Sequence, residues 1–302
     1  MVETVIVNDV GPRDGLQNQA KTLEPGERLQ LIEALLEAGL PSIEVGSFVS
    51  PKAVPAMAGT ADVVAGLPAG KANYSALIPN RRGYDLAVGA GVQTVELVVA
   101  STETMNQKNI NTSTEQAMAN AADIINAARA DGVNILSCVA TAWECPFEGK
   151  VAQDVVLGIA REMFAYGADE VVLADTIGAA DPGAVRSLTQ AAVDEFGAGR
   201  ISCHFHDTRG MGVANVAAAL ASGIRKFDAS IGGLGGCPFA PGATGNVATE
   251  DVVLMLTQMG FETGIDLRKL VEAVDVASEL TGNCDGGHSI RWLRRQIEKG
   301  AI

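Results

Sequence analysis

The chain has 302 residues, of which 47% are hydrophobic and 19% are charged. This composition supplies enough apolar side chains for one large core, and α/β barrels commonly reach this length as a single domain. The formal net charge is −14, and no long basic run offsets it, so we expect no nucleic-acid partner. No stretch approaches the roughly 20 apolar residues that span a bilayer, so we expect no membrane partner either.

The cysteine content predicts reduced thiols. Five cysteines are widely spaced along the chain, and their number is odd, which is not typical of a disulfide framework. The first residues, 1–4, lead directly into a strand and lack the charged and apolar regions of a secretory signal. We therefore expect a cytoplasmic protein.

A short apolar, β-branched run followed by a loop and an amphipathic stretch recurs along the whole chain. Most of these runs are continuous rather than alternating, which is typical of parallel strands buried on both faces. The eight predicted strands are residues 4–9, 42–46, 72–78, 94–99, 134–139, 170–174, 200–206 and 226–231.

Helix-length segments with clear end signals lie between these runs. One begins at Pro25 and ends near Ala38, one covers residues 114–131 before Gly132, and one begins at Asp181-Pro182 and runs towards Phe196. Residues 250–259, 267–281 and 289–299 predict further helices. Eight βα units favour an α/β fold, a (β/α)8 TIM barrel with additional C-terminal helices, over a doubly wound open sheet. We expect a single domain over 1–302, with a core at about 4–260 and a helical segment at 261–302.

In such barrels, reactive groups come from the carboxyl ends of the strands. Arg13 and Asp14 follow the first strand, and a carboxylate there can bind a metal while the guanidinium holds an oxyanion. Alone, the pair would read as a surface ion pair. His204 and His206 end the seventh strand and point the same way, because side chains two apart share a face. They are two of the three histidines in the chain, which favours a pair of metal ligands.

The amide oxygen of Asn246 can complete this ligand set. One carboxylate, one amide and two imidazoles suit Mg²⁺ or Mn²⁺, and zinc is less favoured because no thiolate participates. Glu44 and Asp175, placed after the second and sixth strands, can orient ligands or act as acid–base groups. Alone, either would be read as a helix cap.

The loop at residues 232–238 is rich in glycine and carries Cys237. It superficially resembles a dinucleotide fingerprint, but Pro238 intervenes and no helix opens at its end. We therefore interpret it as a mobile loop that carries one thiol over a closed site. The alternative for Cys237 is an inert small residue.

Together, these residues resemble the DRE-type metal-dependent TIM-barrel superfamily, and the loops resemble its branch of 3-hydroxy-3-methylglutaryl-CoA lyases. The combination spans roughly residues 5–260. The motifs are GPRDGLQN at 11–18, EVGSFVSP at 44–51, KNIN at 108–111, CPFEG at 145–149, DTIG at 175–178, GLGGCP at 233–238 and GATGNVATED at 242–251.

This resemblance implies a carbon–carbon lyase that cleaves 3-hydroxy-3-methylglutaryl-CoA to acetoacetate and acetyl-CoA, as in leucine catabolism. It implies that Arg13 stabilises the developing enolate and that Cys237 helps to protonate it. His204 and Asp175 compete for the role of general base, and Glu44 remains an orienting or acid–base candidate.

The resemblance also implies an acyl-CoA partner and a homodimer. The loop positions that face the acyl portion in this family are Gln17, Ser47, Asn80 and Asn109. Lys52, Arg81 and Lys108 are candidate partners of the CoA phosphates, with ordinary surface residues as the alternative.

Two places depart from the family pattern. Arg209 stands where an apolar or aromatic residue is usual, and it can bind a second substrate carboxylate. Cys138 replaces a tyrosine and Trp143 is bulky, so we expect both to reshape the acyl pocket at the barrel mouth.

These departures leave other functions open. A sibling substrate is one of them, either a longer-chain 3-hydroxy-3-alkylglutaryl-CoA or a citramalyl-type ester. A Claisen-type condensing synthase and a silent CoA-binding protein are further alternatives. The synthase would carry a long C-terminal extension, and the silent protein would have lost a ligand or the arginine.

Overall fold

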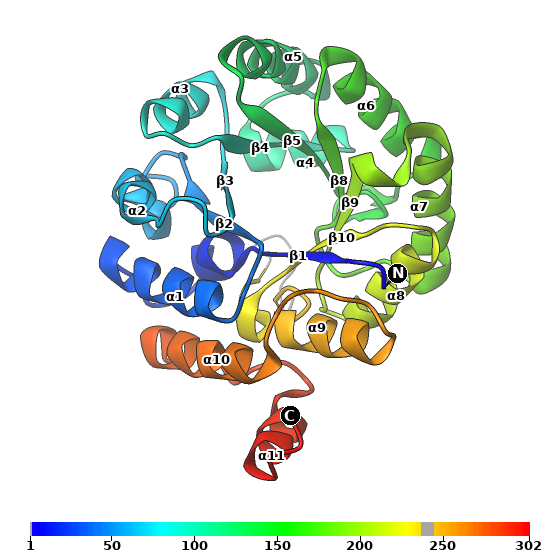
Figure 1. Ribbon diagram of the computed structural model, residues 1–302. Coiled ribbons are helices and arrows are strands. Elements are labelled where there is room, and N and C mark those ends of the chain that lie inside the picture. Colours follow the sequence, from blue (N-terminus) through cyan, green and yellow to red (C-terminus); the bar gives the residue numbers. More distant parts are fainter. Residues whose placement is uncertain (1, 237–244) are drawn as a thin grey trace.

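The computed structural model describes residues 2–236 and 245–302 and forms a closed barrel of eight parallel strands (Figure 1). The predicted (β/α)8 barrel is confirmed, and the doubly wound sheet is wrong, because β1 pairs with both β2 and β10 and so closes the sheet. The barrel strands are β1 (Ile6–Asp9), β2 (Ser42–Ser47), β3 (Asn73–Leu77), β4 (Thr94–Ala100), β5 (Asn134–Ala140), β8 (Glu170–Asp175), β9 (Ile201–Phe205) and β10 (Lys226–Ala229).

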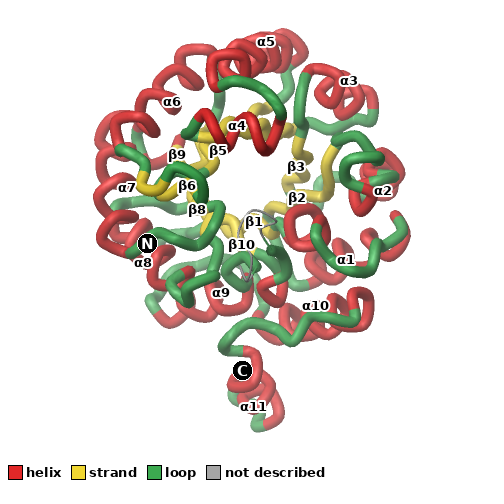
Figure 2. Tube along the Cα trace, turned by 180° about the vertical axis from the view of Figure 1, so that it is seen from behind, coloured by secondary structure: helices red, strands yellow, loops and turns green. Residues whose placement is uncertain are grey.

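Helices form a ring outside the barrel, and α4 (Glu103–Ile110) lies within that ring, over one end of the strands (Figure 2). The ring places an apolar face of each helix against the outer face of the sheet. Its members are α1 (Pro25–Glu37), α2 (Thr60–Gly66), α3 (Arg81–Gly89), α5 (Thr114–Asp131), α6 (Gln153–Tyr166), α7 (Pro182–Phe196), α8 (Gly212–Ala221) and α9 (Thr249–Gln258).

Side-chain caps fix the ends of several helices where the sequence predicts them. Asp181 accepts hydrogen bonds from the first backbone amides of α7, and Ser113 does the same for α5. Helix α5 ends at Gly132, whose left-handed conformation terminates the helix. These local signals explain why the predicted helices at 114–131 and 182–196 have the observed bounds.

A short antiparallel hairpin follows β5 and was not predicted. It pairs β6 (Glu144–Cys145) with β7 (Gly149–Lys150). Two strands of two residues each carry no periodic pattern, so nothing in the sequence distinguishes them from a loop.

Side chains alternate along each strand between the outer face of the barrel, which packs against the helices, and the barrel lumen. Outward-facing side chains such as Ile43 and Phe205 form the main apolar core between sheet and helices. Inward-facing side chains are in large part polar and buried, and they include Asn8, Glu44, Glu96 and Asp228. The barrel lumen is therefore the place where the sequence concentrates buried charge.

The C-terminal segment packs α10 (Leu267–Thr281) against α1 and ends in α11 (Ile290–Glu298), which projects from the barrel (Figure 1). The connection between the two helices is held by two carboxylates of α9. Glu250 accepts the amides of Gly287 and Gly232, and Asp251 accepts the amides of His288 and Ser289. The C-terminal segment is thus tied to the turn that follows β10.

In the described part of the chain, no helix has the length and apolar character needed to cross a membrane. The division into one domain with a core at about 4–260 and a helical segment at 261–302 stays a prediction. The observed packing of α10 on α1 is compatible with it.

Candidate active site

A single π-helical turn, Gly11–Gly15, presents Arg13 and Asp14 directly after β1. A side chain at Gly11 has no room, because a Cβ there would lie 2.7 Å from Asp9 Oδ1 and 2.9 Å from Ile231 Cγ2. The tight approach at this glycine lets the turn fold back over the end of the strand. Arg13 donates to Asp14 Oδ1 at 2.6 Å, so the two side chains point into the same space.

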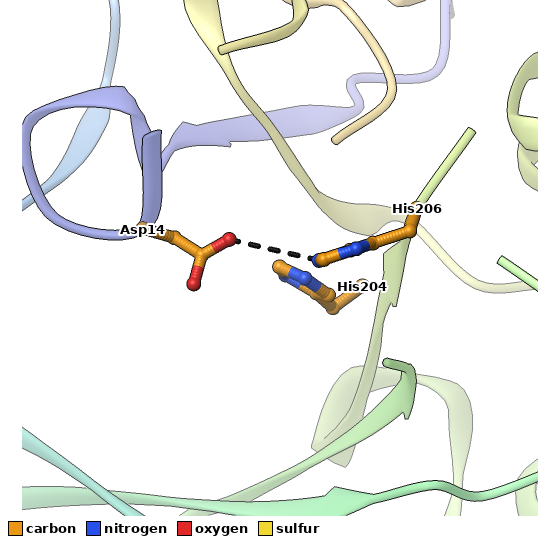
Figure 3. Close-up of side chains that lie close together, drawn as sticks. All are labelled: Asp14, His204 and His206. Atoms are coloured by element: carbon orange, nitrogen blue, oxygen red, sulfur yellow. Dashed lines mark ion pairs between the residues drawn. The ribbon is translucent and has the colours of Figure 1, made fainter. Parts of the chain in front are cut away.

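His204, on the inner face of β9, and His206, directly after that strand, lie side by side, with ring centroids 5.1 Å apart (Figure 3). Asp14 approaches them from the β1 side, and its Oδ2 lies 3.6 Å from His206 Nε2. One ligand atom from each of these three residues lies within 4.8 Å of the others. The structure therefore brings together three of the four predicted metal ligands in a cluster suited to one cation.

Asp228 of β10 orients this cluster and was not among the residues predicted from the sequence. Its Oδ2 accepts from His204 Nδ1 at 3.1 Å, so that Nε2 is the nitrogen left for a ligand bond. Burial lowers the pKa of His204, but the hydrogen bond and charge of Asp228 outweigh it and raise that pKa. A charged residue inside the apolar strand 226–231 was the available signal.

Asn246, the fourth predicted ligand, is buried beside the other three. Its Nδ2 donates to Asp14 Oδ2 at 2.8 Å and to the carbonyl of Leu234 at 3.1 Å. Its Oδ1 has no hydrogen-bond partner among the described residues. A buried amide oxygen without a donor is a free acceptor for a cation. The four residues fit a divalent metal with oxygen and nitrogen ligands.

Glu44 holds Arg13 in place. Glu44 was predicted to follow the second strand, but it lies within β2. Arg13 Nε donates to Glu44 Oε2 at 2.6 Å, and both side chains are buried. Burial lowers the pKa of Arg13, but the charges of Glu44 and Asp14 raise it well above its usual value. Asp14 behaves in the opposite sense. Burial raises its pKa, but Arg13, His206 and His204 together lower that pKa well below the usual range.

Asp175 is the last residue of β8, and it too had been placed just beyond the strand. Its two oxygens accept the amides of Ala179 and Ala180 at 2.9 and 3.0 Å, so it shapes the loop after β8. Burial raises its pKa above the ordinary value, against these hydrogen bonds and the nearby charges of His206 and His204. The two histidines therefore lie close enough to Asp175 for their charge to act on its carboxyl.

The lumen holds a further acid that sequence reasoning missed. Glu96 of β4 is 3% exposed, and burial together with the charges of Glu44 and Asp228 raises its pKa well above the usual range. Cys138 of β5 lies in the same lumen, where burial and then Glu96 raise the pKa of its thiol. Cys138 therefore faces the barrel interior, and its expected effect on the acyl pocket at the barrel mouth stays a prediction.

Trp143 lies elsewhere. Its ring packs on Phe205, with centroids 5.5 Å apart, in the core outside the strands, so its predicted place at the barrel mouth is wrong. The bulky side chain follows the strand end and turns outward beneath the β6–β7 hairpin. It lines a cavity of about 300 Å³ between that hairpin and α7.

The predicted substrate contacts are spread around the rim. Ser47 is buried at the end of β2, and its hydroxyl has no partner among the described residues, whereas Gln17 is half-buried. Asn80 is exposed and caps α3 by accepting from the Gly83 amide, and Asn109 is exposed on α4. Their roles as substrate contacts stay predictions.

Arg209 is also on the rim. Its guanidinium donates to Glu144 at 3.3 Å and to the carbonyl of Ala179 at 3.2 Å. Its side chain is 48% exposed, so the pair with Glu144 leaves one side open to solvent. The predicted contact of Arg209 with a substrate carboxylate stays a prediction.

Cys237 falls outside the described residues, but the approach to it is described. Gly232, Gly233 and Gly235 all have positive φ, and Asn18 donates to the carbonyl of Gly236 at 3.0 Å. The segment that leads to Cys237 therefore runs beside the turn that carries Arg13.

Comparison with known families decides the class of protein. The HMGL-like family matches residues 4–277, which include the whole barrel and most of α10. The chain belongs to the HMGL-like family. The expected carbon–carbon lyase is thereby confirmed.

HMGL-like relatives of known function differ in the substrate that they are named for. A Pseudomonas aeruginosa 3-hydroxy-3-isohexenylglutaryl-CoA/hydroxy-methylglutaryl-CoA lyase is 42% identical over 94% of this chain and 95% of its own length. The (R)-citramalyl-CoA lyase of Chloroflexus aurantiacus is also 42% identical, over 93% and 92%.

Solved HMGL-like structures share the whole fold. The hydroxymethylglutaryl-CoA lyase of Pseudomonas aeruginosa superimposes with a TM-score of 0.94 at 41% identity, covering 98% of this chain and 99% of that one. An Acinetobacter baumannii HMG-CoA lyase in complex with coenzyme A and 3-methylmalate has a TM-score of 0.91 at 36% identity, covering 95% and 94%.

Proposed function

We propose that this lyase cleaves 3-hydroxy-3-methylglutaryl-CoA to acetoacetate and acetyl-CoA with the help of Mg²⁺ or Mn²⁺. The observation that carries the proposal is the cluster of Asp14, His204 and His206 beside the buried pair of Arg13 and Glu44. The relatives named for this reaction support it. Asn246 is the fourth proposed ligand, because its oxygen lacks a donor.

The reaction develops negative charge on two oxygens of the substrate, that of the C3 hydroxyl and that of the thioester, and each needs a stabilising group nearby. Asp14, His204, His206 and Asn246 would hold a divalent cation, whose Lewis acidity would make the C3 hydroxyl of the substrate easier to deprotonate. When the hydroxyl proton leaves, C3 becomes a ketone and the bond between C2 and C3 breaks. The electron pair passes to the thioester as an enolate, and Arg13 stabilises the resulting oxyanion. Protonation of C2 then gives acetyl-CoA.

Three residues are proposed to move protons. His204 or Asp175 takes the proton of the C3 hydroxyl, since both lie at the strand ends around the candidate metal site. His204 can act as the base only while its Nε2 is not bonded to the cation, because its Nδ1 already donates to Asp228. Cys237, carried by the glycine-rich segment, donates the proton to C2. Glu44 holds Arg13 in position throughout.

Two sibling substrates are the alternatives. The Pseudomonas aeruginosa relative is named for a longer-chain 3-hydroxy-3-alkylglutaryl-CoA, and the Chloroflexus aurantiacus relative for a citramalyl ester. A Claisen-type condensing synthase has less support, because none of the relatives described above is named for a condensation. In each case the acyl portion is proposed to meet residues of the rim, namely Gln17, Ser47, Asn80, Asn109 and Arg209.

We also propose that the protein works as a cytoplasmic homodimer in leucine catabolism. Lys52, Arg81 and Lys108 are the proposed partners of the CoA phosphates. Of these, Arg81 already pairs with Asp85 and Asp123 on the surface, which weakens its case.

The test is an assay of acetoacetate release from 3-hydroxy-3-methylglutaryl-CoA with added Mg²⁺ or Mn²⁺. Cleavage should stop with EDTA, return with excess metal and collapse in Arg13→Ala. Arg161→Ala is the matched control, because Arg161 pairs with Glu195 on the exposed surface. A folded, metal-loaded protein that releases no acetoacetate would refute the methylglutaryl substrate, and the sibling esters would be assayed next.

A further inference from the structure

Glu96 points into the barrel lumen from the middle of β4. Its register partners are Leu77 on β3 and Leu136 on β5, both from strands that flank it in the barrel. The next inward residue of the same strand is Val98. Burying a carboxyl group between apolar neighbours costs free energy unless the group is hydrogen-bonded, so we expect Glu96 to have a hydrogen-bond partner in the lumen.

Glu44, which also faces the lumen, has one carboxylate oxygen that accepts no hydrogen bond from the described residues. Its Oε2 accepts from Arg13 Nε, whereas its Oε1 is buried without a partner among the described residues. Both side chains are buried in the lumen, from β2 and β4, and only β3 lies between these two strands. The charge of Glu44 also raises the pKa of Glu96. Two carboxyl groups at close range are stable when one proton lies between them.

We propose that Glu96 is a positioning residue of the lyase, which as a neutral acid donates a hydrogen bond to Glu44 Oε1 and so holds Glu44 against Arg13. This rests on the proposed function, because Arg13 is taken there to stabilise the enolate. Glu96 itself does not touch the reacting atoms. It acts through Glu44 on the direction in which the guanidinium points.

Arg13 Nε donates to Glu44 Oε2, which favours the ionised form of Glu44, so a proton shared by the pair belongs on Glu96. Burial, Glu44 and Asp228 raise the pKa of Glu96 well above its usual value, and Arg13 lowers it only in part. Burial raises the pKa of Glu44 to about 7, against the lowering effect of the charge and hydrogen bond of Arg13. The remaining facing groups are Asp14, Cys138, Glu170, Lys226 and His204.

The experiment compares variants that keep or remove the donor. Glu96→Gln keeps a neutral N–H donor of similar shape, whereas Glu96→Leu and Glu96→Ala remove it. We expect Glu96→Gln to stay within about threefold of the wild-type kcat. Both apolar variants should lose about tenfold or more in kcat with little change in KM, because a lost hydrogen bond to a charged group has this effect. Val98→Ala, one inward position further along β4, controls for general loosening.

A second readout does not need the substrate. The Arg13 Nε–H signal in proton–nitrogen NMR, assigned through its loss in Arg13→Lys, reports the bond to Glu44. We expect Glu96→Gln to preserve its position and protection from exchange, and the two apolar variants to exchange faster. If the wild type fails to cleave 3-hydroxy-3-methylglutaryl-CoA, the proposed function fails, while this signal still tests Glu96.

Three outcomes would overturn the proposal. The first is equal kcat in Glu96→Gln and Glu96→Leu, whether normal or impaired. The second is a loss in Val98→Ala as large as in Glu96→Leu. The third is an unchanged Arg13 signal in both apolar variants.

Discussion

Replacing Asp228 by asparagine should weaken metal binding, because it favours the tautomer of His204 that carries its proton on the nitrogen facing the metal. Asp228 accepts two hydrogen bonds, from Asn8 Nδ2 at 2.8 Å and from His204 Nδ1 at 3.1 Å. Asparagine has one acceptor oxygen, so its amide group must face one of these two donors. If it faces His204, the imidazole accepts at Nδ1 and carries its proton on Nε2, where the ligand bond would form.

The expected size of the effect follows from the role of Asp228 as an orienting group rather than a ligand. Loss of such a partner typically weakens metal binding by about 10–100-fold, which corresponds to about 1.4–2.7 kcal/mol. The fold should survive, because Asp228→Asn keeps the shape of the side chain and removes a buried charge.

The assay is a titration of Mn²⁺ followed by electron paramagnetic resonance of the free ion. Glu170→Gln is the matched control, since Glu170 is also a lumen carboxylate but bonds Ser202 and Lys226 instead of a histidine. A dissociation constant for Asp228→Asn equal to that of the wild type would refute the role assigned to Asp228.

Three further predictions address the ligand set, the packing and the pH dependence. Asn246→Leu should weaken Mn²⁺ binding by about tenfold or more, measured in the same titration, and wild-type affinity would exclude Asn246 as a ligand. Gly232→Ala places a Cβ 2.2 Å from Cys284 Sγ at positive φ. It should cost about 3 kcal/mol of unfolding free energy in denaturant, against about 1 kcal/mol for Gly132→Ala, which has open space; equal losses would contradict the clash. Burial raises the pKa of Asp9 to about 7, above its value in the unfolded chain, so the folded state binds the extra proton. The unfolding free energy of the wild type relative to Asp9→Asn should therefore fall as the pH rises from about 4 to about 7, and a constant difference would show otherwise.

The barrel was predictable from the sequence because each strand is a buried run between clear helix signals. His204 and His206 were found for the same reason, since alternation along a strand fixes which residues share a face. Asp228 and Glu96 follow the same rule but were passed over, because each lies in the middle of an apolar run rather than at its end. A charge inside such a run indicates a lumen position, and this signal was available.

The outward turn of Trp143 could not be predicted from the sequence. Its direction depends on the hairpin of β6 and β7, whose two-residue strands carry no pattern of their own. The partners of His204 and Arg13 were equally hidden. Pairs such as Arg13 with Glu44 join residues that are 31 positions apart, and only the closure of the barrel brings them together.

Two backbone amides donate to Glu250, and together they link the C-terminal segment to the turn that leads to the candidate active site. Gly232 lies on the path from β10 to Cys237, and Gly287 lies between α10 and α11, yet both donate to one buried carboxylate. If the tail between the helices detached, Glu250 would keep half of its backbone bonds in an apolar setting, and the turn after β10 would lose its shared anchor. Proteolytic removal of that tail should then inactivate the enzyme, although the cleaved bond lies outside the barrel.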